Sequence, residues 1–355
     1  MLNFAVIGCG RISIKHCELL GLGLIPGARL VAVSDANLSR AQEVGIRFKI
    51  PHYENFNDML RREDIDVVSI LTPSGLHANH VLAVAEFKKH IVVEKPLALS
   101  LDDADRMKEA CRNQNIELFI VKQNRFNVPI VRLRQELESG RFGKLVMGTV
   151  RVRWCRDQAY YDQDDWRGTW SLDGGVFVNQ ASHHIDLLQW MMGDVESVCA
   201  KAGTYLVDIE TEDTGVALLK FKNGALGIIE ATTACRPKDL EGSLSILGEN
   251  GSVEIGGFAA NEIRHWNFRP ATSKDQNVIQ NYSVNPPDAY GYGHKAFLNY
   301  VVECLSQGKK NYLNAEEGRK SLELIMAIYE SVESKKEVVF PFKPSECLLG
   351  KNRDR

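Results

Sequence analysis

Over the first 121 residues, short apolar runs alternate with stretches that have helical spacing. Each run is too short for a helix and ends at glycine, proline or a polar residue. This rhythm is typical of repeated β-α-β units around a buried parallel sheet. The runs are FAVIG, ARLVAVSD, DVVSILTP, HIVVEKP and IELFIV, which begin at residues 4, 28, 66, 90 and 116.

The pattern changes near residue 122, after which longer strands separated by turns dominate. The strand patterns occupy segments 144–154, 214–233 and 242–255, and Asn223-Gly224 and Asn250-Gly251 are hairpin signals. Antiparallel sheet is therefore expected here. Helical spacing recurs at 128–139, 179–192, 291–307 and 315–333, and the polar stretch 269–289 is expected to be a loop.

A chain of 355 residues is long enough for two domains with separate cores. We expect an α/β fold class: a Rossmann domain with a doubly wound parallel sheet over 1–121, then an α+β domain with a large, mainly antiparallel open sheet over 122–355.

Composition excludes several classes of function. The 43 Lys and Arg residues nearly balance 46 Asp and Glu, which leaves a net charge of −3 and no basic stripe for nucleic acid or a membrane surface. The eight cysteines form no CxxC pair, so we expect reduced thiols and no metal site. An N-terminus that enters an apolar strand at once predicts a cytoplasmic protein without a membrane segment.

The first apolar run leads directly into GCGRIS at residues 8–13, a candidate dinucleotide-binding turn. Gly8 would form the tight turn and Gly10 would let the backbone approach a pyrophosphate, alongside Arg11 and Ile12. Asp35 ends the second run, where an acid accepts hydrogen bonds from the adenosine ribose and repels a 2'-phosphate. NAD is thus favoured over NADP. The alternative is that Asp35 only caps the next helix.

Two more strand ends point to the same sheet edge, where ligands bind in open α/β folds. One carries Thr72, Pro73, Ser74 and His77; the other carries Glu94 and Lys95 before Pro96. Proline restricts the residue before it to extended backbone, which would direct the Lys95 ammonium into the cleft. A solvated strand-end charge is the alternative.

Two histidines open the helical pattern after residue 181, and a histidine on such a helix is more often a core residue than a catalyst. His183, Leu187 and Trp190 lie along one stripe, whereas His184 is turned about 100° away. We expect His183 to face a site and His184 to flank it.

The motifs AVIGCGRIS, TPSGLHA, EKPLALS and HHID, in this order, resemble the glucose-fructose oxidoreductase, inositol dehydrogenase and MocA (Gfo/Idh/MocA) family. The resemblance implies that Lys95 is the active-site lysine and that His183 and Asp186 form the H-x-x-D pattern. It also implies that the second domain binds substrate and carries the contacts of a homotetramer. Many relatives have an aspartate where this chain has Asn179, which cannot raise the pKa of His183 by its charge.

Three further segments, 122–127, 166–190 and 209–233, are similar to nucleotide-sugar 3-dehydrogenases of the WlbA type. This similarity implies NAD-dependent oxidation of the C3 hydroxyl of UDP-N-acetylglucosaminuronate in bacterial surface-polysaccharide biosynthesis. A dehydrogenase of a free sugar or inositol, a non-catalytic NAD and sugar sensor, and an NAD-using glycosidase are alternatives.

In the 3-dehydrogenase interpretation, His183 is the general base and Lys95 stabilises the developing oxyanion. The predicted cofactor contacts are Gly8, Gly10, Arg11, Ile12, Asp35, Thr72, Pro73, Ser74, His77, Glu94, Lys95, Gln123, Trp166 and Arg167. The predicted substrate contacts are Lys95, Gln123, Arg125, Asn179, Ser182 and His183. Trp166 and Trp170 would wall the sugar or cofactor, or belong to local core.

Overall fold

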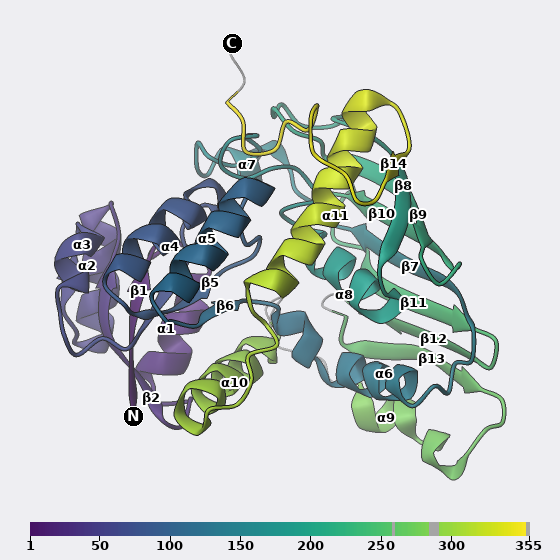
Figure 1. Cartoon of the computed structure of the whole chain (residues 1–355), viewed down its shortest axis with the longest axis horizontal. Coiled ribbons are helices and arrows are strands. Elements are labelled where there is room, and N and C mark those ends of the chain that lie inside the picture. The colour runs from purple at the N-terminus through teal and green to yellow at the C-terminus, as the bar shows by residue number, and fades with distance from the viewer. Residues whose placement is uncertain (258–259, 284–290, 353–355) are drawn as a thin grey trace. The chain divides into compact units, whose positions relative to one another are not determined.

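The computed structural model describes residues 1–257, 260–283 and 291–352, and these form two compact units (Figure 1). The first unit consists of Met1–Gln123 and Gly293–Leu322, and the second of Asn124–Tyr292 and Glu323–Arg355. Each is described by itself.

The first unit contains a six-stranded sheet in the order β3-β2-β1-β4-β5-β6, in which every pair is parallel. The strand order reverses beside β1, so the switch point of the doubly wound fold lies between β1 and β4. The strands are β1 (Leu2–Ile7), β2 (Ala28–Ser34), β3 (His52–Tyr53), β4 (Val67–Ile70), β5 (His90–Val93) and β6 (Leu118–Ile120). The predicted Rossmann domain is confirmed.

Helices connect these strands, and a side chain caps the start of three of them. The Ser100 hydroxyl, for example, accepts a hydrogen bond from the Asp103 amide at the start of α5. The helices are α1 (Ser13–Gly21), α2 (Leu38–Phe48), α3 (Phe56–Leu60), α4 (His77–Glu86), α5 (Leu101–Asn113) and α10 (Gly293–Gln307), with the short 3-10 helix η1 (Ser74–Leu76).

The segment 293–322 groups with the first unit, although the sequence pattern assigned it to the second domain. The buried face of α10 includes Phe297, Leu298 and Val301, and this helix packs on α1. Farther along, the Asn311 amide donates to the Leu118 carbonyl at 3.0 Å, next to the sheet. A late segment thus completes the core of the first unit.

The second unit contains an eight-stranded sheet in the order β13-β12-β11-β7-β10-β9-β8-β14. Only β7 and β10 pair in parallel, so the predicted mainly antiparallel sheet is confirmed, as are both hairpins. The strands are β7 (Leu145–Arg153), β8 (Val195–Gly203), β9 (Thr214–Phe221), β10 (Leu226–Thr232), β11 (Glu241–Gly248), β12 (Gly251–Gly256), β13 (Glu262–Phe268) and β14 (Val338–Val339).

One face of this sheet is buried and the other is open. On β9 and β10 the buried residues Ala217, Leu219, Ile229 and Ala231 alternate with exposed ones, and α8 packs on β7 and β11. The helices named in this unit are α6 (Val128–Glu138), α7 (Gln158–Tyr161), α8 (Ser182–Met192) and α9 (Val278–Tyr282); α11 (Ala315–Ser334) runs from the first unit into the second, and the 3-10 helix η2 (Gln123–Phe126) begins at the unit boundary.

The polar stretch 269–289 has more regular structure than the sequence predicts. It contains the 3-10 helix η3 (Ser273–Asp275) and α9, and residues 284–290 lie outside the described residues. Asp275 fixes η3, because its carboxylate accepts from the Thr272 amide and from the Arg141 guanidinium.

Candidate functional site

The turn after β1 has the geometry that a dinucleotide phosphate needs. Gly8 has φ +96°, and an added Cβ would lie 2.8 Å from the Leu71 carbonyl oxygen, so only glycine fits. An added Cβ on Gly10 would meet no atom within 4 Å, which leaves room beside the backbone. The buried Ser13 hydroxyl donates to the Gly10 carbonyl at 2.6 Å. No side chain caps α1, and the start of a helix attracts an anion.

Asp35 belongs to this turn. Its carboxylate accepts a hydrogen bond from the Cys9 amide at 2.7 Å and another from the Asn37 amide at 2.8 Å. Asn37 itself caps α2 by accepting from the Ser39 amide. The alternative that Asp35 is only a helix cap is therefore wrong, and its position after β2 fits a ribose contact.

His77 connects the loops that follow β4 and β5. Its Nδ1 lies 2.8 Å from the Pro96 carbonyl oxygen and its Nε2 lies 3.0 Å from the Thr72 carbonyl oxygen. The ring is buried at 1% exposure. This geometry favours a positioning role for His77 over the predicted contact with the cofactor, whereas Pro73 and Ser74 are half-buried at the sheet edge.

Lys95 follows β5 at the same edge and is half-buried. The Glu94 carboxylate beside it is buried at 6% exposure and accepts a hydrogen bond from the Lys95 amide at 3.2 Å. Gln123, at the end of the first unit's first segment, is also buried. The Lys95 side chain thus projects from a backbone that buried groups hold in place.

In the second unit, the two adjacent histidines of α8 lie in different environments. His184 is buried at 1% exposure, its ring meets Trp154 edge-on at 6.0 Å, and burial lowers its pKa to about 4. It is a neutral core residue rather than the flanking residue that the sequence predicts. His183 is only half-buried, so it is the histidine that a ligand can reach.

The aspartate of H-x-x-D binds an arginine. The Arg125 guanidinium donates two hydrogen bonds to the Asp186 carboxylate, at 2.8 and 2.9 Å, and its side chain is 9% exposed. The Trp190 ring lies 4.7 Å below the same guanidinium. Arg125 therefore fixes α8, and its predicted contact with substrate remains a prediction.

In the loop before α8, the side-chain amide of Asn179 binds the carboxylate of Asp173. The Asn179 side-chain nitrogen donates to one oxygen of Asp173, and the Gly168 amide donates to the other at 2.9 Å. Asp173 is 2% exposed. Many relatives have a carboxylate at position 179 itself. In this chain the carboxylate is that of Asp173, which Asn179 binds.

The two tryptophans of this loop differ. Trp170 is buried and meets the Tyr329 ring edge-on at 5.2 Å, so it is local core. Trp166 is half-buried beneath the Arg167 guanidinium at 4.5 Å, and Arg167 also donates to the Tyr160 hydroxyl. Of the two tryptophans, Trp166 stays a candidate for ligand contact, together with its neighbour Arg167.

Sequence reasoning missed four buried polar residues next to these sites. Three of them have partners that are distant along the chain, and no motif marks the fourth, whose partner is six residues away. They are His16 and His294 beside Glu94, Asp173 beside Asn179, and Glu212 beside the 175–177 turn. All eight cysteines are free thiols, as expected.

Family models match both parts of the chain. Residues 2–121 match the NAD-binding Rossmann fold of this oxidoreductase family, and residues 134–340 match its C-terminal alpha/beta domain. The chain belongs to the Gfo/Idh/MocA oxidoreductase family. The glycine-rich turn and Asp35 fit the NAD that this family binds.

Solved structures of the Gfo/Idh/MocA family include two near relatives. The WlbA dehydrogenase from Bordetella pertussis, in complex with NADH and UDP-GlcNAcA, is 40% identical, with a TM-score of 0.92 over 96% of this chain and 98% of that one. The WlbA dehydrogenase from Chromobacterium violaceum, with the same ligands, is 39% identical, with a TM-score of 0.90 over 96% of each chain.

Curated relatives extend the range of substrates. The myo-inositol 2-dehydrogenase of Thermotoga maritima is 29% identical over 95% of this chain and 98% of its own length. The NAD-dependent scyllo-inositol 2-dehydrogenase of Bacillus subtilis is 25% identical over 92% and 93%. The chain is thus an NAD-dependent sugar dehydrogenase of this family. No helix in the described residues is long and apolar enough to span a bilayer.

Proposed function

We propose that this dehydrogenase oxidises the C3 hydroxyl of UDP-N-acetyl-D-glucosaminuronate to the 3-keto sugar, as a step in bacterial surface-polysaccharide (lipopolysaccharide O-antigen) biosynthesis. One observation carries the proposal: the chain is 40% identical to a WlbA dehydrogenase bound to UDP-GlcNAcA but 29% identical to the myo-inositol enzyme, over nearly the same length.

The start of α8 supports a carboxylate-bearing substrate. The Ser182 hydroxyl, in the first residue of this 11-residue helix, is buried at 6% exposure and has no hydrogen-bond partner among the described residues. The first amides of a helix attract anions. A uronate carboxylate at this position would satisfy both the hydroxyl and the helix end.

The proposed chemistry uses two groups of the chain. Bound NAD would supply the acceptor for the hydride of sugar C3. His183 removes the C3 hydroxyl proton, since an imidazole ordinarily titrates near neutrality. The Lys95 ammonium donates a hydrogen bond to the same oxygen and stabilises its developing negative charge. Asn179, held by Asp173, orients a sugar hydroxyl.

A second candidate is the oxidation of a free sugar or an inositol. The curated relatives favour it, because the myo-inositol and scyllo-inositol dehydrogenases align over more than nine tenths of this chain. It requires the same roles for Lys95 and His183 but no subsite for a carboxylate or a diphosphate.

The deciding experiment follows the near-ultraviolet absorbance of reduced nicotinamide. Purified protein and NAD are mixed separately with UDP-N-acetylglucosaminuronate, UDP-N-acetylglucosamine, glucose and myo-inositol. We expect a rise with the nucleotide uronate and little or none with the others. A rise with glucose or myo-inositol alone would select the second candidate, and silence with all four would contradict both.

Substitutions then test the roles. We expect His183→Asn to lower kcat by about 10²- to 10⁴-fold and Lys95→Ala by about 10²- to 10³-fold, with smaller effects on KM. Ser182→Ala is the matched control: it should raise KM for the uronate about tenfold and leave kcat nearly unchanged. Equal losses in all three variants would point to misfolding instead.

The proposal includes a cytoplasmic homotetramer. The open face of the eight-stranded sheet exposes Val216, Leu218 and Leu226, at 48, 62 and 57%. Exposed apolar side chains grouped on one sheet face are typical of a subunit contact.

A further inference from the structure

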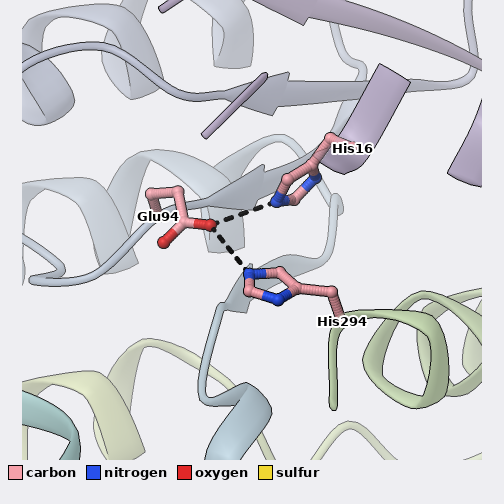
Figure 2. Close-up of side chains that lie close together, drawn as sticks. All are labelled: His16, Glu94 and His294. Carbon is pink, nitrogen blue, oxygen red and sulfur yellow. Dashed lines mark hydrogen bonds and ion pairs between the residues drawn. The ribbon is translucent and has the colours of Figure 1, made fainter. Parts of the chain in front are cut away.

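Two histidines flank the Glu94 carboxylate inside the first unit (Figure 2). The Nε2 atom of His16, from α1, lies 3.1 Å from the Glu94 Oε1 atom. The Nε2 atom of His294, from the start of α10, lies 3.6 Å from the same oxygen. The exposed fractions of His16, Glu94 and His294 are 0, 6 and 0%, so none of the three meets solvent freely. We call these residues the His-Glu-His triad.

The protonation state of the triad follows from its surroundings. Burial alone would raise the pKa of Glu94, but the hydrogen bond from His16 and the nearby His294 ring outweigh burial and hold this pKa well below the ordinary value. Burial lowers the pKa of His16. At neutral pH the triad therefore contains a carboxylate that accepts from a neutral His16. The His16 Nδ1 atom has no hydrogen-bond partner among the described residues, which places the ring proton on Nε2.

The donor atoms could in principle bind a cation, since they lie within 4.8 Å of one another. Two histidines and one glutamate also form a known zinc-binding set. A metal-bound histidine, however, almost always donates its second ring N–H to an outer acceptor, and the His16 Nδ1 atom has none among the described residues. The geometry favours a hydrogen-bonded triad.

The second oxygen of Glu94 connects the triad to the active-site lysine. Glu94 Oε2 accepts the Lys95 amide at 3.2 Å, and the Glu94 amide donates to the Ile70 carbonyl at 3.0 Å. On the other side of Lys95, His77 lies 2.8 Å from the Pro96 carbonyl oxygen. Buried groups therefore hold the backbone on both sides of Lys95.

We propose that His16 and His294 are positioning residues for Lys95, which they hold through the carboxylate of Glu94. Without them, the Glu94 Oε1 atom would be a buried acceptor that faces no histidine, and the carboxylate would turn to another partner or take up a proton. The Lys95 amide would then lose its acceptor, and the backbone from which the Lys95 side chain extends would no longer be fixed. A misplacement of about 1 Å of a catalytic group costs about 100-fold in rate.

The role in catalysis rests on the proposed function, but the contact itself can be tested without turnover. Protein labelled with ¹⁵N-lysine gives an amide signal for Lys95, which is identified by its loss in Lys95→Arg. We expect this signal to move in His294→Leu and His16→Leu, each of which removes an imidazole that faces Glu94 Oε1. It should stay near its wild-type position in His294→Gln, whose amide nitrogen replaces Nε2.

The kinetic test uses whichever substrate reduces NAD. We expect His294→Leu to lower kcat by about 10- to 100-fold, His294→Gln to restore most of it, and the affinity for NAD to change little. In a Lys95→Ala background His294→Leu should have almost no further effect, because both substitutions remove the same contribution. If His294→Leu does not fold, His294→Asn, which is too short to reach Glu94, replaces it.

The matched control is His90→Leu. His90 begins β5, the strand that Glu94 follows, and its Nδ1 accepts the Glu117 amide at 3.0 Å. This substitution should lower the free energy of unfolding but leave the Lys95 amide signal and kcat unchanged.

Three results would overturn the proposal. One is an unchanged Lys95 amide signal in both His294→Leu and His16→Leu. Another is a rate loss that adds fully to that of Lys95→Ala. The third is one equivalent of zinc that elemental analysis finds in the wild type and not in His294→Leu, since the triad would then be a metal site. If no sugar is oxidised, the proposed function fails while the amide signal still decides the role of the triad.

Discussion

Glu212 is a buried carboxylate just before β9, and it closes the turn that leads to α8. One of its oxygens accepts the Phe177 amide at 3.1 Å and the Tyr329 hydroxyl at 2.9 Å. An added Cβ on Gly175 would lie 2.1 Å from the carboxylate, so the backbone approaches it closely only because residue 175 is glycine. Burial outweighs these hydrogen bonds and raises the pKa of Glu212 to about 7.

This raised pKa predicts how stability depends on pH. A group whose pKa is higher in the folded state contributes stability below its unfolded pKa and loses that contribution as pH rises through the folded pKa. For Glu212 the loss runs from about pH 4.5 to about pH 7 and amounts to about 3 kcal/mol. Urea unfolding at several pH values should show that the free energy of unfolding falls less in Glu212→Gln than in the wild type over this pH window. Parallel curves would show that Glu212 does not titrate there.

At the scale of residues, the sequence predicts those site residues whose contacts are with residues close along the chain. Gly8, Gly10 and Ser13 share one turn, and the turn forms as expected. The contact between Asp173 and Asn179 spans only six residues, yet no motif marks it, because its geometry depends on the fold of the loop. His16 and His294 could not be found at all, since their partner Glu94 is 78 and 200 residues away.

At the scale of elements, α8 is fixed in two ways. Its apolar face packs on β7 and β11, and Asp186 on its other side binds Arg125 from η2. The side chains of this pair are 9 and 8% exposed, so water screens the pair little. Because α8 carries His183, the orientation of the proposed base depends on this ion pair.

We expect Asp186→Asn to lower the free energy of unfolding by about 3–5 kcal/mol, because it leaves the Arg125 charge buried without its counterion. It should also lower kcat more than it changes the affinity for NAD. Chemical denaturation measures the first effect. The control is Glu196→Gln, which breaks the exposed Lys220 pair and should change stability little. Equal effects of the two substitutions would contradict a special role for Asp186.

Element patterns are also what the sequence predicts best. The predicted helices at 128–139 and 315–333 agree with α6 and α11 to within a residue, because an apolar stripe of helical spacing is a local property. The placement of α10 in the first unit is not local. It depends on which apolar face meets which helix, and nothing within 293–307 reports its partner.

At the scale of the whole molecule, the open sheet face has the pattern of a subunit contact. Leu218 lies opposite Ile228, and Val216 lies opposite Glu230, on neighbouring strands β9 and β10. Arg153 binds Glu230 on the same face at 2.6 and 2.8 Å. The face therefore combines apolar residues with paired charges, as interface centres and rims do.

Light scattering coupled to gel filtration should give the mass of a tetramer for the wild type. Leu218→Lys should yield smaller species, because four buried charges without partners would oppose assembly. Lys222→Glu, a reversal at an exposed charge on the turn after β9, is the control and should leave the mass unchanged. A monomeric wild type would contradict the proposed tetramer. An unchanged mass for Leu218→Lys would show that the interface does not include the open sheet face.

The first unit is encoded in two separate stretches of the gene. A fragment that ends at residue 123 would keep the glycine-rich turn but lose α10, and with α10 the histidine that faces Glu94. Such a fragment would expose the apolar surface that Phe297 and Leu298 cover. Recombination that exchanges nucleotide-binding halves between relatives must therefore transfer residues 293–322 together with the first 123, so this enzyme evolves its two halves less independently than their separate cores suggest.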